Sequence, residues 1–321
     1  MPFPTGIVDA IDPARLRLLL EVDRRGSISA AAEACRISQP SATKQLKALE
    51  AAIGEKLVER NGRASRVTEP GRVVVAHAAR VLDTLQGLRE ELDALHGAET
   101  GTLALAASTT SGAYVLPAIL RCFAEKHPGV EVDIAIGSSA WVAERVAKRE
   151  FSLGIAGETE LPDGVRAEPF LDDELVGIAA PGRVRPRRGK VPRSELERWT
   201  LLVREQGSST RAVAERHMAR SGYHAANRWE LDSNEAIKRS VQAGLGVGFV
   251  SRLVVADEIE RGELVSFRIE GTEPMSRSIH LLLPDDRDPT PSERAFITTL
   301  SECCAVTVAG CAVDGRSTDR G

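Results

Sequence analysis

The amino-acid sequence predicts three parts: a mainly helical N-terminal domain, one long helix, and an α/β domain of two lobes. Apolar residues recur at helical spacing up to about residue 96, and strand and helix patterns alternate from residue 102 onward. A chain of 321 residues is long enough for two or three domains. Its composition, 42% hydrophobic and 27% charged, is that of a globular protein rather than of a disordered chain.

The N-terminal domain begins with three short helices. The first runs through Leu16 and Leu19 and ends near Gly26. Ser27 is expected to cap the second helix and Ser38 the third, which carries Pro40 in its first turn, where a missing N–H costs little. Because only a short turn separates the second and third helices, the pattern indicates a helix-turn-helix.

The third helix carries side chains that suit a DNA surface. Gln can bond an adenine edge, Ser and Thr can bond bases or phosphates, and Lys can meet phosphate or guanine. After it, Asn61-Gly62-Arg63-Ala64 separates two short strand patterns and predicts a hairpin, the wing of a winged helix-turn-helix. The predicted DNA-binding residues are Ser27, Ser38, Gln39, Pro40, Ser41, Thr43, Lys44, Lys47, Arg63 and Arg66.

The distribution of charge supports this interpretation. The whole chain has a formal net charge of −4, which excludes a protein that is basic throughout. Residues 36–72, however, contain eight basic and four acidic residues, a net charge of +4, which leaves −8 for the rest. A local basic surface on an acidic protein is typical of DNA binding, although a solvated face of any small helical domain could show the same count.

A long helix is expected from Glu69 to about residue 96, with Thr68 as its cap. At 1.5 Å per residue it would be about 40 Å long. Its apolar residues follow a heptad pattern that predicts a homodimer, although the same stripe could pack against the chain's own C-terminal part. This seam consists of Val74, Ala78, Val81, Leu85, Leu88, Leu92 and Leu95.

The remainder predicts mostly parallel strands with helices on both faces. We expect domains at 1–68, 69–100 (the linker helix and hinge) and 101–304. In the last of these, the first lobe would cover about 101–173 and 268–304, the second about 174–267, and two crossing strands would join them. The final helix is expected over about 291–304, and the polar tail 305–321 is expected to be disordered.

A ligand cleft is expected between the lobes, because ligands of such sheets bind where strands end and helices begin. Four of these junctions are rich in hydroxyl and amide groups, which favour a small anion beside helix N-termini; plain N-capping is the alternative. Arg204 and Arg211 flank the third junction and could add positive charge to the site, but each is expected to be a surface residue. The predicted effector-binding residues are Ser108, Thr109, Thr110, Ser138, Ser139, Ser208, Ser209, Thr210 and Asn234.

Other classes of function find little support in the sequence. No apolar run is long enough to span a membrane and no signal peptide is recognisable, so a cytoplasmic protein is expected. The five cysteines and six histidines show no metal-binding spacing, and the junctions hold no acid/base pair or activated nucleophile. We therefore expect no metal, no cofactor and no enzymatic activity. A cytoplasmic solute-binding protein or an enzyme on the same two-lobed fold is the alternative.

The segments 24–32, 37–50, 54–60 and 67–71 closely resemble the DNA-binding domain of LysR-type transcriptional regulators. The resemblance extends to about residue 300. It implies an effector domain like type 2 periplasmic solute-binding proteins, a homodimer that assembles further into a homotetramer, and the DNA and effector contacts named above. Residues 202–211 resemble the branch that senses sulfur metabolites or phosphorylated sugars of carbon fixation. Lys44 stands where the family more often has Arg, which puts a bidentate guanine contact in doubt.

Overall fold

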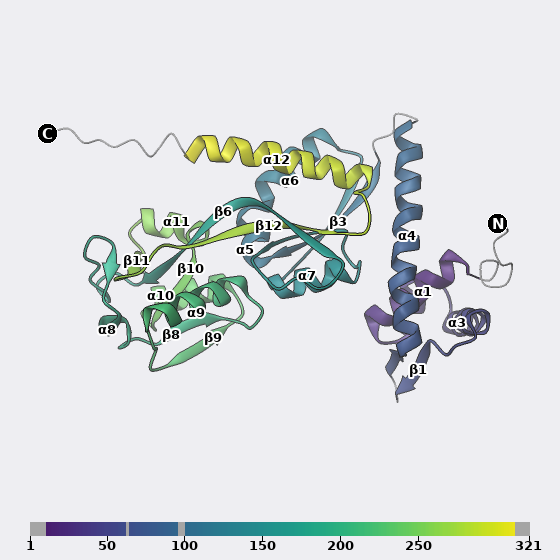
Figure 1. The fold of residues 1–321 in the computed structure, drawn as a ribbon, viewed down its shortest axis with the longest axis horizontal. Coiled ribbons are helices and arrows are strands. Elements are labelled where there is room, and N and C mark those ends of the chain that lie inside the picture. Colours follow the sequence, from purple (N-terminus) through teal and green to yellow (C-terminus); the bar gives the residue numbers. More distant parts are fainter. Residues whose placement is uncertain (1–10, 62–63, 96–99, 312–321) are drawn as a thin grey trace. The chain divides into compact units, whose positions relative to one another are not determined.

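The computed structural model describes residues 11–61, 64–95 and 100–311 of the chain (Figure 1). The chain divides into two compact units, Met1–Gly97 and Ala98–Gly321. In the described part, no helix is both long enough and apolar enough to cross a membrane.

The first unit is built on α1 (Pro13–Arg25), α2 (Ile28–Ala34) and α3 (Gln39–Ile53), as the sequence predicts. Asp12 caps α1 by accepting a hydrogen bond from the Ala14 amide at 2.8 Å. Gly26 ends that helix with φ of 63°, a left-handed conformation that glycine adopts without strain. Leu18, Leu19 and Leu49 are fully buried, and small alanines on α2 let the three helices pack closely.

The wing consists of β1 (Val58–Asn61) and β2 (Ala64–Val67), which pair antiparallel. The predicted loop over 61–64 was too long by two residues, because Asn61 and Ala64 already pair with each other. The turn between them, including Arg63, lies outside the described residues. The Ser65 amide donates to the Gly26 carbonyl at 2.8 Å, which ties the wing to the end of α1.

The long helix α4 spans Glu69–Leu95, and the Thr68 hydroxyl caps it at the Gly71 amide. The two ends of its heptad seam differ. Ala78 is buried and Val74 partly buried against the core of the same unit, where α4 packs on α1. Only the later part of the seam, Val81, Leu85, Leu88 and Leu92, is exposed at 43–53%. The expectation that the whole stripe is free for a partner is therefore wrong for its first turns.

The first lobe of the second unit has a parallel core. Strand β3 pairs in parallel with β4 on one side and β5 on the other. Two helices that meet at Val115 follow β3. The elements are β3 (Gly101–Ser108), α5 (Thr109–Tyr114), α6 (Leu116–Lys126), β4 (Val130–Gly137), α7 (Ser139–Ala147) and β5 (Leu153–Gly157).

Two long antiparallel strands, β6 (Val165–Ala179) and β12 (Met275–Pro284), run between the lobes (Figure 1). Each contributes to two separate cores: Leu175 and Met275 to the second lobe, Leu171 and Ile279 to the first. The chain returns to the first lobe along β12 rather than near residue 268, because β11 still pairs with β6 in the second lobe.

The second lobe repeats the parallel pattern, with β8 between β9 and β10. A short strand, β7, pairs in parallel with β11. Its elements are β7 (Lys190–Val191), α8 (Arg193–Leu196), β8 (Leu201–Arg204), α9 (Ser209–Ser221), β9 (Arg228–Leu231), α10 (Asn234–Gln242), β10 (Val247–Ser251), α11 (Arg252–Glu260) and β11 (Val265–Ile269).

The last helix, α12 (Pro291–Cys311), packs beside α6 through an edge-to-face contact between Phe123 and Phe296 (Figure 1). It is longer than expected, because the backbone of residues 305–311 is helical where we expected the start of a disordered tail. Residues 312–321 lie outside the described part.

Candidate functional site

The start of α3 presents a row of polar side chains. Ser38 caps the helix by accepting from the Ser41 amide at 3.3 Å, and Ser27 caps α2 by accepting from the Ala30 amide at 3.4 Å. Both hydroxyls keep a hydrogen to donate to an outside acceptor. Thr43, half-buried, donates instead to the Gln39 carbonyl at 3.1 Å.

The exposed side chains of α3 lie beside this row and include two lysines, which make this face of the helix cationic. Gln39, Pro40, Lys44 and Lys47 are exposed, and Ser41 is half-buried. Glu50, at the far end of the helix, accepts from the Leu57 and Val58 amides at 2.9 and 3.2 Å and fixes the start of the wing. On the wing, Arg66 is exposed and pairs in register with Glu59.

In the second unit, polar groups of both lobes meet at the N-termini of α5 and α10. The Arg204 guanidinium donates to the Thr109 hydroxyl at 2.9 Å, and the Asn234 amide donates to the Thr110 hydroxyl at 3.0 Å. Arg204 also donates to the Asn234 side-chain oxygen. Ser108 lies next to this cluster and shares a hydrogen bond with Ser111 at 2.9 Å.

Arg204 is not the surface residue that we expected. It is only 2% exposed, at the end of the buried strand β8, and its charge is balanced by a two-point contact with Glu205. A buried arginine that is shared among hydroxyl and amide oxygens can exchange them for an anionic group. The sequence signal was available, since Arg204 directly follows three apolar strand residues.

The N-termini of α7 and α9 face each other from the two lobes. Ser138 caps α7 through the Trp141 amide at 3.2 Å, and the Ala140 amide reaches the Gly207 carbonyl of the opposite lobe at 3.2 Å. Ser139 is buried. On α9, Ser208 makes no capping hydrogen bond, and the buried Ser209 hydroxyl has no hydrogen-bond partner in the described structure.

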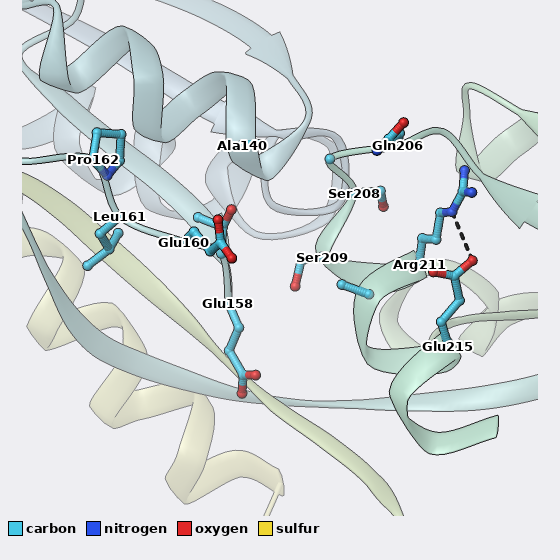
Figure 2. A pocket seen from close by; sticks show the side chains of 13 residues that line it. Ala140, Glu158, Glu160, Leu161, Pro162, Gln206, Ser208, Ser209, Arg211 and Glu215 are labelled. Carbon is cyan, nitrogen blue, oxygen red and sulfur yellow. Dashed lines mark hydrogen bonds and ion pairs between the residues drawn. The ribbon is translucent and has the colours of Figure 1, made fainter. Parts of the chain in front are cut away.

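A cavity of about 610 Å³ opens beside α9 (Figure 2). Gln206, Gly207, Ser208 and Ser209 line one side, and Glu158 to Pro162 of the first lobe line the other. The remaining predicted effector residues do not line it: Thr109, Thr110 and Asn234 belong to the Arg204 cluster described above. The structure thus places Ser208 and Ser209 in the cavity and Ser108, Thr109, Thr110 and Asn234 in or beside the Arg204 cluster, whereas Ser138, Ser139 and Thr210 belong to neither.

The cavity wall is more acidic than an anion site requires. It carries Glu158, Glu160 and Glu215, against one arginine, Arg211. Burial raises the pKa of Glu215, but hydrogen bonds from Arg228 and Arg211 outweigh it, so the pKa is lowered overall. Arg211 is half-buried and also bonds Glu230, so its charge is already shared. The positive charge of Arg204 therefore attracts an anion more strongly than this acidic wall does.

A second buried ion pair joins the crossing strands and was not anticipated. Arg277 of β12 bonds Asp173 of β6 at 2.7–2.8 Å and also donates to the Thr210 hydroxyl at 3.0 Å. The Thr210 hydroxyl, expected to face a ligand, thus accepts a hydrogen bond from the crossing strand β12. The alternation Met275, Arg277, Ile279 along β12 could have revealed an inward arginine.

No group of three or more His, Cys, Asp or Glu side chains in the described residues is arranged to hold a metal ion.

Comparison with known proteins gives the identity of both units. Residues 13–72 match the family model for the bacterial regulatory helix-turn-helix protein, lysR family, and residues 96–305 match that for the LysR substrate binding domain.

Relatives agree with these matches. The RuBisCO operon transcriptional regulator of Acidithiobacillus ferrooxidans is 30% identical over 286 residues, covering 89% of this chain and 92% of the relative. The HTH-type transcriptional regulator CbbR of Sinorhizobium medicae is 32% identical over 283 residues, covering 88% and 90%.

Solved structures support the fold. A full-length OxyR variant of Pseudomonas aeruginosa superposes with a TM-score of 0.72 at 22% identity, over 92% of this chain and 95% of that one. The regulatory domain of CcmR from Synechocystis PCC6803, in complex with 2-PG, has a TM-score of 0.59 at 28% identity, over 64% of this chain and 98% of that one.

The predicted winged helix-turn-helix and two-lobed α/β domain are thereby confirmed. The chain belongs to the LysR family and is a DNA-binding transcriptional regulator with an effector-binding domain, not an enzyme.

Proposed function

We propose that a small anion bound between the lobes controls how this regulator binds its promoter. The observation that carries the proposal is the buried guanidinium of Arg204, which holds Thr109 of the first lobe and Asn234 of the second at once. An anion that took these donors would bind both lobes and shift the balance between two arrangements of the domain. The 2-PG in the related CcmR domain supports an anionic ligand.

The ligand would also use the hydroxyls around this cluster. At the start of α9, the Ser208 hydroxyl makes no capping hydrogen bond and the Ser209 hydroxyl has no partner in the described structure. That helix N-terminus also favours negative charge. The proposed effector residues are Ser108, Thr109, Thr110, Ser138, Ser139, Ser208, Ser209, Thr210 and Asn234, with Arg204 added.

For DNA, we propose that α3 enters the major groove and the wing reaches the backbone. Gln39 would read a base edge, while Lys44 and Lys47 would meet phosphate, consistent with their exposure. Ser27, Ser38, Pro40, Ser41, Thr43, Arg63 and Arg66 complete the proposed surface.

We propose further that the chain forms a homodimer through the exposed part of the α4 seam and a homotetramer through its effector domains. Two edge strands of the second unit carry exposed apolar side chains, Ile134 and Ile136 on β4 and Trp229 on β9. Such edges are suited to pairing with another copy. The proposed boundaries remain 1–68, 69–100 and 101–304, and the proposed location is the cytoplasm, where a regulator meets DNA.

Thermal unfolding of the full chain with 2-PG tests the cleft. A ligand at 100 times its dissociation constant stabilises the folded state by about 2.7 kcal/mol. Arg204→Met should abolish this stabilisation, whereas Arg252→Met, which removes an exposed arginine of the same lobe, should retain it. Equal stabilisation of all three proteins would show that the site is misplaced, and none in wild type would reject this ligand class.

A further inference from the structure

A strongly basic segment of the second lobe includes β7 and α8 and runs beside β11 (Figure 1). Residues 182–198 contain seven basic and two acidic residues, a net charge of +5 in a chain whose total is −4. All seven basic residues are exposed. They are Arg183, Arg185, Arg187, Arg188, Lys190, Arg193 and Arg198.

Most of these charges are left without a partner. Arg183 stacks over the Trp199 ring at 5.1 Å, and Arg193 donates to the Ser221 carbonyl at 3.4 Å. The side chains of the other five make no hydrogen bond or ion pair to any residue that the structure describes.

Several arginines elsewhere in the same lobe are neutralised by an acidic partner. Arg211, Arg228 and Arg268 each pair with a glutamate. In the basic segment, mutual repulsion is not offset by contacts within the described lobe. Its charge is therefore available to something outside the lobe.

The tip of the segment is a preformed hairpin. Arg187 and Lys190 exchange two backbone hydrogen bonds, of 2.8 and 3.0 Å. Between them, Arg188 and Gly189 both have positive φ, 50° and 74°, as a tight two-residue hairpin turn requires. Lys190 then pairs with Arg268 of β11, so the hairpin is held against the sheet. A cationic surface that is already ordered loses little conformational entropy when it binds.

We propose that this basic hairpin, residues 185–190, binds the phosphate backbone of double-stranded DNA that flanks the sequence read by α3. Three of its four cationic residues are arginines, whose fork matches phosphate oxygens at two points. No large hydrophobic side chain of residues 182–198 is exposed, whereas protein interfaces depend on buried apolar or aromatic anchors. Since the same chain holds DNA through its other unit, the hairpin acts at high effective concentration.

Such contacts would strengthen binding and its salt dependence without reading sequence. They would also require DNA longer than the part that the winged domains cover. The test therefore compares two duplexes taken from the DNA upstream of the chain's own gene, one trimmed to the core footprint and one with about 20 base pairs added on each side.

The variant replaces Arg187, Arg188 and Lys190 with Gln in the full-length protein. Its matched control replaces Arg121, Arg220 and Arg252 with Gln, three exposed cations of the same unit that lie outside the hairpin. Affinity is measured from low to high salt on both duplexes, with footprints of the longer one.

On the longer duplex, the hairpin variant should bind on the order of tenfold more weakly. Its logarithmic salt slope should fall by about 0.9 for each phosphate that the variant no longer neutralises, and its footprint should shorten. On the core duplex it should match wild type and the control. An equal weakening in the control variant would reduce the effect to net charge and overturn the proposal. Unchanged DNA binding combined with lost activation in a purified transcription assay would overturn it too, and would assign the hairpin to an acidic protein.

Discussion

Arg277 and Asp173 form a buried ion pair at the point where the two lobes meet, with Arg277 Nη2 2.7 Å from Asp173 Oδ2. The hydrogen bond from Arg277 to Thr210 links the pair to the start of α9, and one from Ser251 to Asp173, at 2.7 Å, links it to the start of α11. The crossing strands and the starts of α9 and α11 therefore share one polar network at the lobe junction.

Arg277→Met should lower the free energy of unfolding by about 3–5 kcal/mol, because it leaves the Asp173 carboxylate buried and unpaired. The double variant Arg277→Met with Asp173→Leu should recover most of that stability, since no charge is then left inside. Urea unfolding followed by tryptophan fluorescence measures both. A cost below about 1 kcal/mol for the single variant, the range of a surface ion pair, would show that the site is far better hydrated than its 5% exposure indicates.

Ser209→Ala should raise the free energy of unfolding of the ligand-free protein by about 1 kcal/mol, because it removes a buried hydroxyl without a partner. The same variant should bind 2-PG more weakly. Ser251→Ala is the matched control: its hydroxyl is also buried but donates to Asp173, so its removal should destabilise the fold. If the Ser209 variant is as destabilised as the control, the hydroxyl has a structural partner.

Lys238 links α10 to α11 through Glu258 at 2.8 Å, and it also contacts Glu235. Burial raises the pKa of Glu258, but the hydrogen bond from Lys238 outweighs it and the pKa is lowered. A lowered folded-state pKa means that this stabilisation exists above the ordinary glutamate value and is lost as pH falls through the folded one. Lys238→Met should therefore flatten the decline in stability on acidification below about pH 4.5.

The control for this prediction is Arg261→Met, which removes an exposed pair with Asp257 and should leave the acid profile unchanged. Stability is measured by urea unfolding at a series of pH values. An identical decline in wild type and the Lys238 variant would contradict the prediction.

Leu88→Glu should weaken the proposed homodimer by at least about tenfold, because it places a charge in the exposed part of the α4 seam. Val73→Glu introduces the same residue at a position that is 58% exposed but outside the heptad pattern, and should leave the dimer intact. Analytical ultracentrifugation of both proteins measures how far each variant dissociates. Equal dissociation by the two would point away from the seam as the dimer contact.

Local signals predicted much of this molecule. Caps such as Ser27 and Ser38, the glycine at 26 and the period of the apolar residues are properties of short segments, and the helices that they predicted are present. Features that depend on distant partners were harder to foresee. A lone arginine usually lies at the surface. Arg204 and Arg277 are buried because the fold brings each to a partner far away in the sequence, Asn234 and Asp173 respectively. The seam of α4 likewise divides only because α1 covers its first turns.

A titration with 2-PG shows whether a ligand in the proposed cleft changes promoter binding. The affinity of the full-length protein for the DNA upstream of its own gene is measured with increasing 2-PG, for wild type and for Thr110→Val. Linkage requires that a ligand coupled to DNA binding shifts that affinity, by about 5–150-fold for couplings of 1–3 kcal/mol. We predict a shift in wild type, and the same starting affinity without a shift in Thr110→Val. An equal shift in both proteins would show that the ligand acts elsewhere, and DNA binding that 2-PG never changes would show that it does not control the promoter.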